Sequence, residues 1–129
     1  MNTINISDKT QRLTGQQLCS VLVAIDYVTL KFVKYPLLHE GRFSDCADID
    51  IEEGFELSNG EDNFIIRKND GLKEFQLGAS RLIAFIGQYV INVESFPSGE
   101  LILMFDRGSV RLLLSECGFD SFDVNFPNC

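Results

Sequence analysis

Acidic side chains are the residues of this chain whose types and spacing could most readily do chemistry. Asp48, Asp50 and Glu52 alternate with apolar residues, so a strand here would hold all three on one face, about 7 Å apart. This spacing suits a hydrolase that uses two carboxylates, or a hard cation such as calcium held by oxygen ligands. Such a hydrolase also needs one acid desolvated in a pocket, whereas the sequence neighbours here are further acids. A carboxylate hydrolase is therefore a hypothesis that a buried acid would support.

Other catalytic and metal-binding patterns are missing from the sequence. A calcium-binding loop that begins at Asp45 would require glycine at its sixth position, where Asp50 stands. The single histidine, His39, precedes Glu40 and lies in the same stretch as Cys46, without the local signature of a Cys-His dyad. Neither a phosphate-binding glycine loop nor a nucleophile elbow occurs. We expect no catalytic residue, no metal and no cofactor, and hence a protein that is not an enzyme.

The distribution of the acids is more informative than their spacing, because residues 45–62 contain no lysine or arginine. A solvated surface usually intersperses both signs of charge, and like charges on neighbouring strand positions repel each other. The concentration of one sign predicts a surface that binds a basic partner, and a merely soluble strand face is the plainer alternative. The predicted partner-binding residues are Asp45, Asp48, Asp50, Glu52, Glu53, Glu56, Glu61 and Asp62.

Length and charge narrow the class of protein. The 129 residues make one domain, residues 1–129, which is large enough to bury a core without a disulfide or a metal. With 19 acidic and 11 basic residues the net charge is −8, so nucleic acid and anionic membranes would repel the chain, whereas a basic protein would be attracted. Residues 1–12 are polar, and no apolar run approaches the roughly 20 residues that span a bilayer. We expect a cytoplasmic protein that makes no membrane contact.

The four cysteines fit this compartment. They form no CxxC pair, and free thiols are the expected state of all four, which are Cys19, Cys46, Cys117 and Cys129. Cys19 adjoins an apolar run and is predicted to be a buried thiol, whereas Cys129 is predicted to be exposed.

Alternation of apolar and polar residues predicts that strands make up most of the chain. The segments predicted to be strands are residues 28–32, 48–52, 55–57, 64–67, 89–93, 101–105, 110–114 and 119–126. Turn signals separate several of them, at Asn59-Gly60, Pro97-Ser98-Gly99 and Asp106-Arg107-Gly108. The stretch 34–44 breaks the alternation and is predicted to be a longer loop.

One segment has helical spacing instead. Apolar residues recur every three or four positions from residue 72 to residue 86, as in the buried stripe of an amphipathic helix. Gly87 stands where a helix C-terminal cap belongs, and Gly78 inside the segment weakens its helix propensity by about 1 kcal/mol. The residues of the predicted stripe are Leu72, Phe75, Ala79, Leu82, Ile83 and Ile86.

The two halves of the chain resemble each other weakly. Leu13-Thr-Gly15-Gln16 matches Phe85-Ile-Gly87-Gln88, and the apolar positions of three later strands can be paired in the same way. The half-repeats would span residues 13–66 and 85–126, behind a polar N-terminal arm of residues 1–12. The paired positions are Val28, Leu30 and Phe32 with Leu101, Leu103 and Phe105, and Ile49, Ile51, Phe55 and Leu57 with Val110, Leu112, Phe122 and Val124. We therefore predict a mainly β (α+β) domain, with one antiparallel sheet or two packed sheets, a two-fold repeat and one principal helix near residues 72–86.

Taken together, these features resemble a family of bacterial proteins. The Leu13-x-Gly15-Gln16 pattern, the two β-rich halves and the Asp106-Arg107-Gly108 turn between strands look like the small two-repeat immunity proteins of contact-dependent growth inhibition and related polymorphic toxin systems. The resemblance spans residues 13–126 and implies that the partner is a toxin domain, often a nuclease. Because a nuclease binds an anionic substrate, its active site is basic, and an acidic inhibitor surface would fit it.

A second hypothesis comes from another class of function. The phenylalanine-rich interior of a β-domain could hold a cavity for a small ligand, and the acids would then serve solubility alone. A cavity inside the core would favour this ligand-binding or regulatory domain over the toxin inhibitor.

Overall fold

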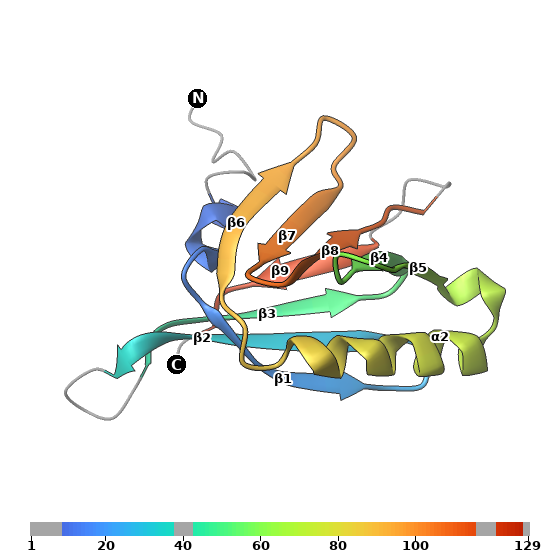
Figure 1. Ribbon diagram of the computed structural model, residues 1–129, viewed down its shortest axis with the longest axis horizontal. Coiled ribbons are helices and arrows are strands. Elements are labelled where there is room, and N and C mark those ends of the chain that lie inside the picture. Colours follow the sequence, from blue (N-terminus) through green and yellow to red (C-terminus); the bar gives the residue numbers. More distant parts are fainter. Residues whose placement is uncertain (1–8, 38–42, 116–120, 128–129) are drawn as a thin grey trace.

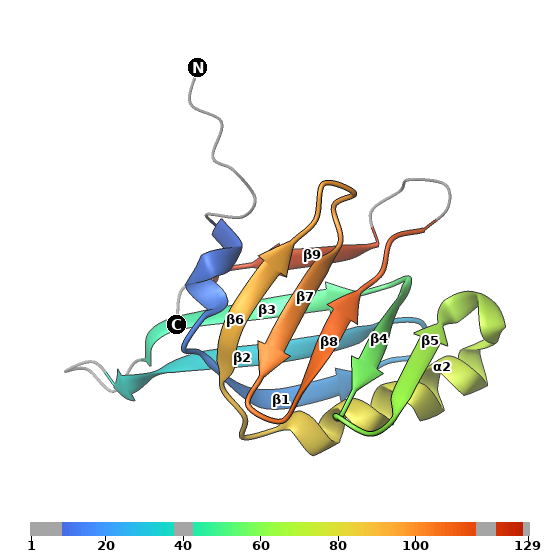
Figure 2. The ribbon, with the colours of Figure 1, turned by 45° about the horizontal axis from the view of Figure 1, so that its top comes forward.

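The computed structural model of the protein describes residues 9–37, 43–115 and 121–127. In these residues two antiparallel sheets pack face to face, with one helix beside them (Figure 1, Figure 2). The predicted mainly β fold is confirmed, and of the two expected arrangements, one sheet or two packed sheets, the protein has the second. Sheet A has the strand order β1-β2-β3-β9, and sheet B has the order β5-β4-β8-β7-β6. The elements are, in chain order, η1 (Gln11–Leu13), β1 (Gln17–Val23), β2 (Val28–Leu37), β3 (Phe43–Ile51), β4 (Gly54–Ser58), β5 (Asn63–Arg67), η2 (Lys68–Asp70), α2 (Leu72–Ala79), η3 (Ser80–Phe85), β6 (Val90–Ser95), β7 (Leu101–Phe105), β8 (Gly108–Leu112) and β9 (Phe122–Asn125).

The hydrophobic core lies between the two sheets, where each strand turns one set of alternate side chains inward. In β2 these include Leu30 and Phe32, and in β7 they include Leu103 and Phe105, none more than 3% exposed. In both strands the inward residues are two positions apart, as the geometry of a β-strand requires. None of the described helices is long and apolar enough to cross a membrane.

The helix fills the side of the sandwich between β5 and β1. It consists of α2 followed without a break by the 3₁₀ helix η3, so the predicted helix near 72–86 is confirmed. Its buried residues include Phe75, Ala79, Leu82 and Phe85. Three members of the predicted stripe are instead exposed, namely Leu72, Ile83 and Ile86. The change to three residues per turn in η3 explains the last two, since it aligns residues 82 and 85 on the inner face and turns 83 and 86 outward.

Each half of the chain contributes its fourth strand to the other half's sheet. Strands β1, β2 and β3 form one side of sheet A, and their counterparts β6, β7 and β8 form one side of sheet B. The next strand of the first half, β4, pairs with β8, while the next strand of the second half, β9, pairs with β3. The two halves are therefore related by an approximate two-fold axis with exchanged fourth strands.

The strand registers follow this relation residue by residue. Ile49 opposes Val124 in sheet A, and Val110 opposes Leu57 in sheet B. A bulge follows Leu18 in β1 and another follows Val90 in β6. The sequence matches between the halves thus coincide with equivalent positions in the fold.

The Gly-Gln pairs meet at the axis, where the start of β1 lies beside the segment that leads into β6. Gly15 N donates to Val90 O, and Gly87 N donates to Leu18 O, at 2.7 and 2.8 Å. Both glycines have a positive φ, of 90° and 97°, which other residues rarely adopt. The repeated glycine is explained by this backbone requirement at two equivalent turns.

Two predictions about the first half are wrong. Residues 34–37 and 43–44, which were expected in a long loop, belong to the paired strands β2 and β3. Cys19 is exposed rather than buried, because the bulge after Leu18 turns its side chain to the outer face of sheet A, where its thiol donates to Lys31 O. Cys46 is buried, and its thiol donates to Pro127 O at 3.3 Å.

Several other expectations concern residues beyond those described. His39, Cys117, Phe119 and Cys129 lie outside the described ranges. The closing strand, expected over residues 119–126, is β9 at Phe122–Asn125, and the expected strand 110–114 ends at Leu112.

Candidate functional site on the outer face of sheet A

The eight predicted partner-binding acids do not gather on one surface. Asp48 and Asp50 project from the outer face of sheet A, and Glu52 follows immediately after that strand. Glu56 lies on the outer face of the opposite sheet, whereas Glu61 and Asp62 are exposed in the turn between β4 and β5. The sequence run is divided because the chain passes from sheet A to sheet B after β3.

Bases from distant parts of the sequence accompany some of these acids. Asp45 is ion-paired with Arg12, with 2.8 Å between Oδ1 and Nη2. Glu53 is ion-paired with Arg67 at 3.5 Å. The absence of lysine and arginine from residues 45–62 therefore does not produce an unbroken negative surface, because strand pairing brings in cations from elsewhere.

A smaller acidic cluster remains on sheet A, and it includes a residue that the sequence reasoning missed. The β3–β9 register places Asp50 directly opposite Asp123, and Asp48 opposite Asn125. On the other side of β3, Asp48 opposes Lys31 in β2. No described lysine or arginine forms an ion pair with Asp48, Asp50 or Asp123. We call these three residues the sheet A acidic cluster.

The equivalent pair of residues in sheet B combines a negative and a positive charge. By the two-fold relation, the pair Asp50–Asp123 corresponds to Arg111–Glu56, which oppose each other across β8 and β4. Arg111 is also ion-paired with Glu100, at 2.5 Å between Nη2 and Oε1. Like charges directly opposite each other destabilise a sheet, whereas opposite charges stabilise it. The fold thus accommodates a balanced pair at this site, yet sheet A carries a repulsive one.

The sheet A acidic cluster is accessible. The helix and sheet B both lie on the inner side of sheet A, so no described helix or strand covers its outer face (Figure 1, Figure 2). Asp123 is exposed, and Asp48 and Asp50 are half-buried. The hydroxyl of Thr29 donates to Asp50 Oδ1 at 2.6 Å and fixes that carboxylate on the surface.

The geometry offers little to a carboxylate hydrolase. All eight predicted acids are half-buried or exposed, so none is desolvated as a general acid would be. Within the described ranges, His, Cys, Asp and Glu form no group of three that could hold a metal ion. Asp48 and Asp50 lie on one face of their strand, as predicted, but that face is the outer one and neither side chain is fully buried.

One thiol adjoins the acidic cluster. Cys19 lies on the same face, near Lys31 and Asp48. Partial burial raises the pKa of the Cys19 thiol above its ordinary value, and the nearby Asp48 carboxylate acts in the same direction. The thiol is therefore protonated at neutral pH and is a weak nucleophile.

Comparison with known proteins identifies no relative. No protein-family model, curated protein or solved structure matches the chain. The charge and geometry of the chain itself are therefore the basis for assigning its function.

Proposed function

We propose that this protein is a non-catalytic immunity protein, which binds and neutralises a basic toxin domain through the outer face of sheet A. The observation that carries the proposal is the uncompensated pair Asp50 and Asp123, which face each other across two strands. A cation from a partner would relieve their repulsion and gain an ion pair with two carboxylates. The repulsion raises the free energy of the unbound protein, and its relief makes binding more favourable.

The partner's chemistry follows from the site. Three acids that form no ion pair with a described lysine or arginine, on a chain of net charge −8, favour a protein whose binding surface is rich in lysine or arginine. A nuclease domain meets this condition because its active site binds phosphate. An acidic protein seated on that site would both neutralise its charge and exclude its substrate.

The proposal is tested by charge reversal on this face. In the triple variant Asp48→Lys, Asp50→Lys and Asp123→Lys, the rate of association with the toxin domain encoded beside this gene falls by roughly tenfold or more at low salt. Stopped-flow or surface-based kinetics at several salt concentrations provide the measurement. Rising salt slows the wild-type association, because screening limits the field to about 8 Å at physiological ionic strength.

A matched control separates the site from the overall charge. Asp62→Lys, Asp70→Lys and Asp106→Lys reverse three exposed acids outside sheet A and change the net charge equally. Equal loss of association in both variants would reject the sheet A face as the interface. The immunity role itself is rejected if cells that express the wild-type protein stay fully sensitive to the toxin.

A further inference from the structure

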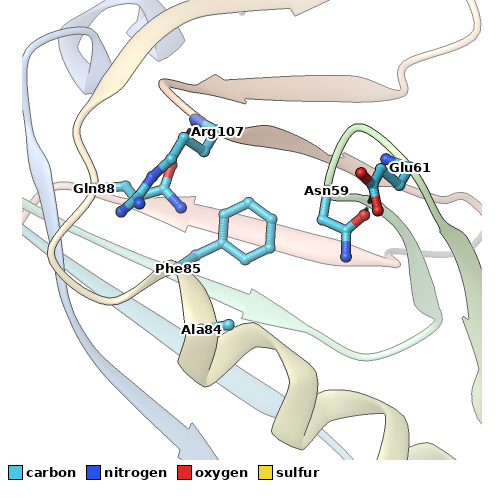
Figure 3. Close-up of a pocket in the computed structure, with 6 residues that line it drawn as sticks. All are labelled: Asn59, Glu61, Ala84, Phe85, Gln88 and Arg107. Atoms are coloured by element: carbon cyan, nitrogen blue, oxygen red, sulfur yellow. Dashed lines mark hydrogen bonds between the residues drawn. The ribbon is translucent and has the colours of Figure 1, made fainter.

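A surface groove lies between η3, the β4–β5 turn and the β7–β8 turn. It has a volume of about 340 Å³ and is lined by Asn59, Glu61, Ala84, Phe85, Gln88 and Arg107. Figure 3 shows Arg107 and Gln88 at one end, Asn59 and Glu61 at the other, and the Phe85 ring between them. A smaller hollow of about 170 Å³ adjoins it and shares Asn59, Ala84 and Phe85. The groove is thus polar at both ends with an aromatic floor.

The two-fold relation explains why this corner is hollow. The equivalent corner of the first half is filled by Arg12, whose guanidinium lies 4.1 Å from the centroid of the Phe126 ring. Ala84 occupies the position equivalent to Arg12, and Asn59 occupies the position equivalent to Phe126. Two large side chains in one half are therefore replaced by two small ones in the other, and the space between them is the groove.

The groove also contains an arginine without an ion-pair partner. Among the described arginines, Arg12, Arg67 and Arg111 each bind a carboxylate. Arg107 at the groove, and Arg81 beside the smaller hollow, bind none within the described ranges. The guanidinium of Arg81 is instead stacked over the Phe64 ring at 3.8 Å. Arg107 is thus a guanidinium at the groove that forms no ion pair with a described carboxylate.

A buried amide stands beside this guanidinium. Gln88 is 9% exposed, and its Oε1 accepts a hydrogen bond from the backbone N–H of Arg107 at 2.8 Å. That bond directs the amide, while its Nε2 has no hydrogen-bond partner among the described residues. The residues at this end of the groove therefore carry two sets of N–H donors, one charged and one neutral.

We propose that this groove binds a single carboxylate attached to an apolar group. Arg107 and Gln88 Nε2 would donate to the carboxylate, and the apolar group would lie over Phe85 and Ala84. Guanidinium forks match carboxylates in geometry, as the two hydrogen bonds from Arg12 to the two oxygens of Asp45 illustrate. Glu61 at the far end disfavours ligands with several negative charges, such as phosphate esters. This site is separate from the sheet A acidic cluster and does not rest on the proposed immunity function.

The test uses the full chain labelled with ¹⁵N and three soluble probes. 3-Phenylpropionate represents a free small acid, acetyl-Phe-Glu-amide represents an acidic peptide, and 3-phenylpropionamide is the neutral control. We expect saturable chemical-shift changes at residues 59, 85, 88 and 107 with one or both acids and none with the neutral amide. Response to the first acid alone identifies a small-molecule ligand, and response to the peptide identifies a polypeptide ligand.

Variants assign the response to the groove. Arg107→Gln raises the Kd by roughly tenfold or more, because it removes a charged hydrogen bond. Ala84→Arg introduces the residue that fills the equivalent corner and abolishes the shifts, and Asn59→Phe does the same should the first variant fold poorly. Lys73→Gln removes an exposed cation of α2 away from the groove and leaves the Kd unchanged.

The proposal is overturned if neither acid produces saturable shifts at the groove residues. It is also overturned if the neutral amide binds as tightly as its acid, or if inorganic phosphate displaces the acids at equal concentration. Unchanged binding in both Arg107→Gln and the filled-groove variant would likewise exclude this site.

Discussion

Phe32 and Phe105 occupy equivalent positions in the two halves and are among the most buried side chains of the core. Phe32 is 1% exposed, and Phe105 is 3% exposed with its ring centroid 5.2 Å from that of Phe85. Either Phe32→Ala or Phe105→Ala should lower the free energy of unfolding by roughly 3–5 kcal/mol, because each leaves a cavity between the sheets. Denaturant titration followed by circular dichroism measures the change. A loss below about 1 kcal/mol at both sites would contradict the assignment of the inner face.

At the residue scale, the sequence predicted on which face of a sheet a side chain lies more reliably than it predicted the residues that the side chain contacts. Alternation placed Asp48 and Asp50 outward, and they do project from the outer face. The ion pair between Asp45 and Arg12, and the repulsive partner Asp123, could not be predicted from a local pattern, since they depend on contacts across 33 and 73 residues. The weak repeat could have indicated Asp123, because the equivalent residue in the first half is Glu56, which belongs to the acidic stretch.

At the scale of elements, Gly78 shows how packing overrides helix propensity. Glycine normally weakens a helix by about 1 kcal/mol relative to alanine. Here α2 approaches β5 so closely that a Cβ on residue 78 would lie 2.7 Å from Cγ2 of Ile66 and closer still to Cγ1. Ile66 is β-branched and 8% exposed, so it has little freedom to move away. The glycine lets the helix pack against the sheet.

Gly78→Ala should therefore destabilise the protein, by roughly 1–3 kcal/mol, instead of stabilising it. The same substitution made together with Ile66→Ala should cost less than the sum of the two single changes, because the shortened side chain leaves room for the new methyl group. A double-mutant cycle from urea denaturation measures this coupling. Additive effects, or a more stable Gly78→Ala protein, would show that the helix does not depend on this close approach.

Most elements could be predicted because their alternation and turn signals are local. The extension of β2 and β3 past the core could not be predicted from the sequence, because inward and outward residues no longer alternate beyond the edge of the sandwich. Beyond it, the ring of Tyr35 packs edge-on against Phe43 at 5.3 Å, a contact made across the two strands. The 3₁₀ geometry of η3 was also missed, because a three-residue and a four-residue spacing share several apolar positions over one turn.

At the scale of the whole molecule, the two-fold relation distinguishes features that both halves share, and that the fold requires, from features that occur in one half alone. Equivalent positions share their backbone hydrogen bonds and core residues, as at Gly15 and Gly87. Among the positions where they differ are the pair Asp50–Asp123 against Arg111–Glu56, and the open corner at Ala84 against the filled one at Arg12. Since the common frame tolerates both alternatives, neither difference is demanded by folding. Both proposed binding sites lie where the halves diverge.

This reasoning predicts that one substitution should improve the fold while it impairs the function. Asp123→Arg converts the pair with Asp50 into a pair of opposite charges, as at Glu56–Arg111, but with the acid and the base exchanged between the two strands. The free energy of unfolding should rise by roughly 0.2–1 kcal/mol, because a repulsive cross-strand pair becomes attractive. Affinity for a basic partner should fall, because the partner's cation loses one carboxylate and meets a guanidinium in its place.

Urea denaturation and a binding titration on the same preparation measure the two effects. Glu61→Arg is the matched control, since it makes the same change of charge at an exposed turn residue with no acid opposite it in a sheet. A less stable Asp123→Arg protein would mean that the pair is not repulsive in the folded state. A more stable protein with undiminished affinity would confirm the electrostatics of the sheet and remove this face from the interface, because relief of the repulsion would then occur without any partner.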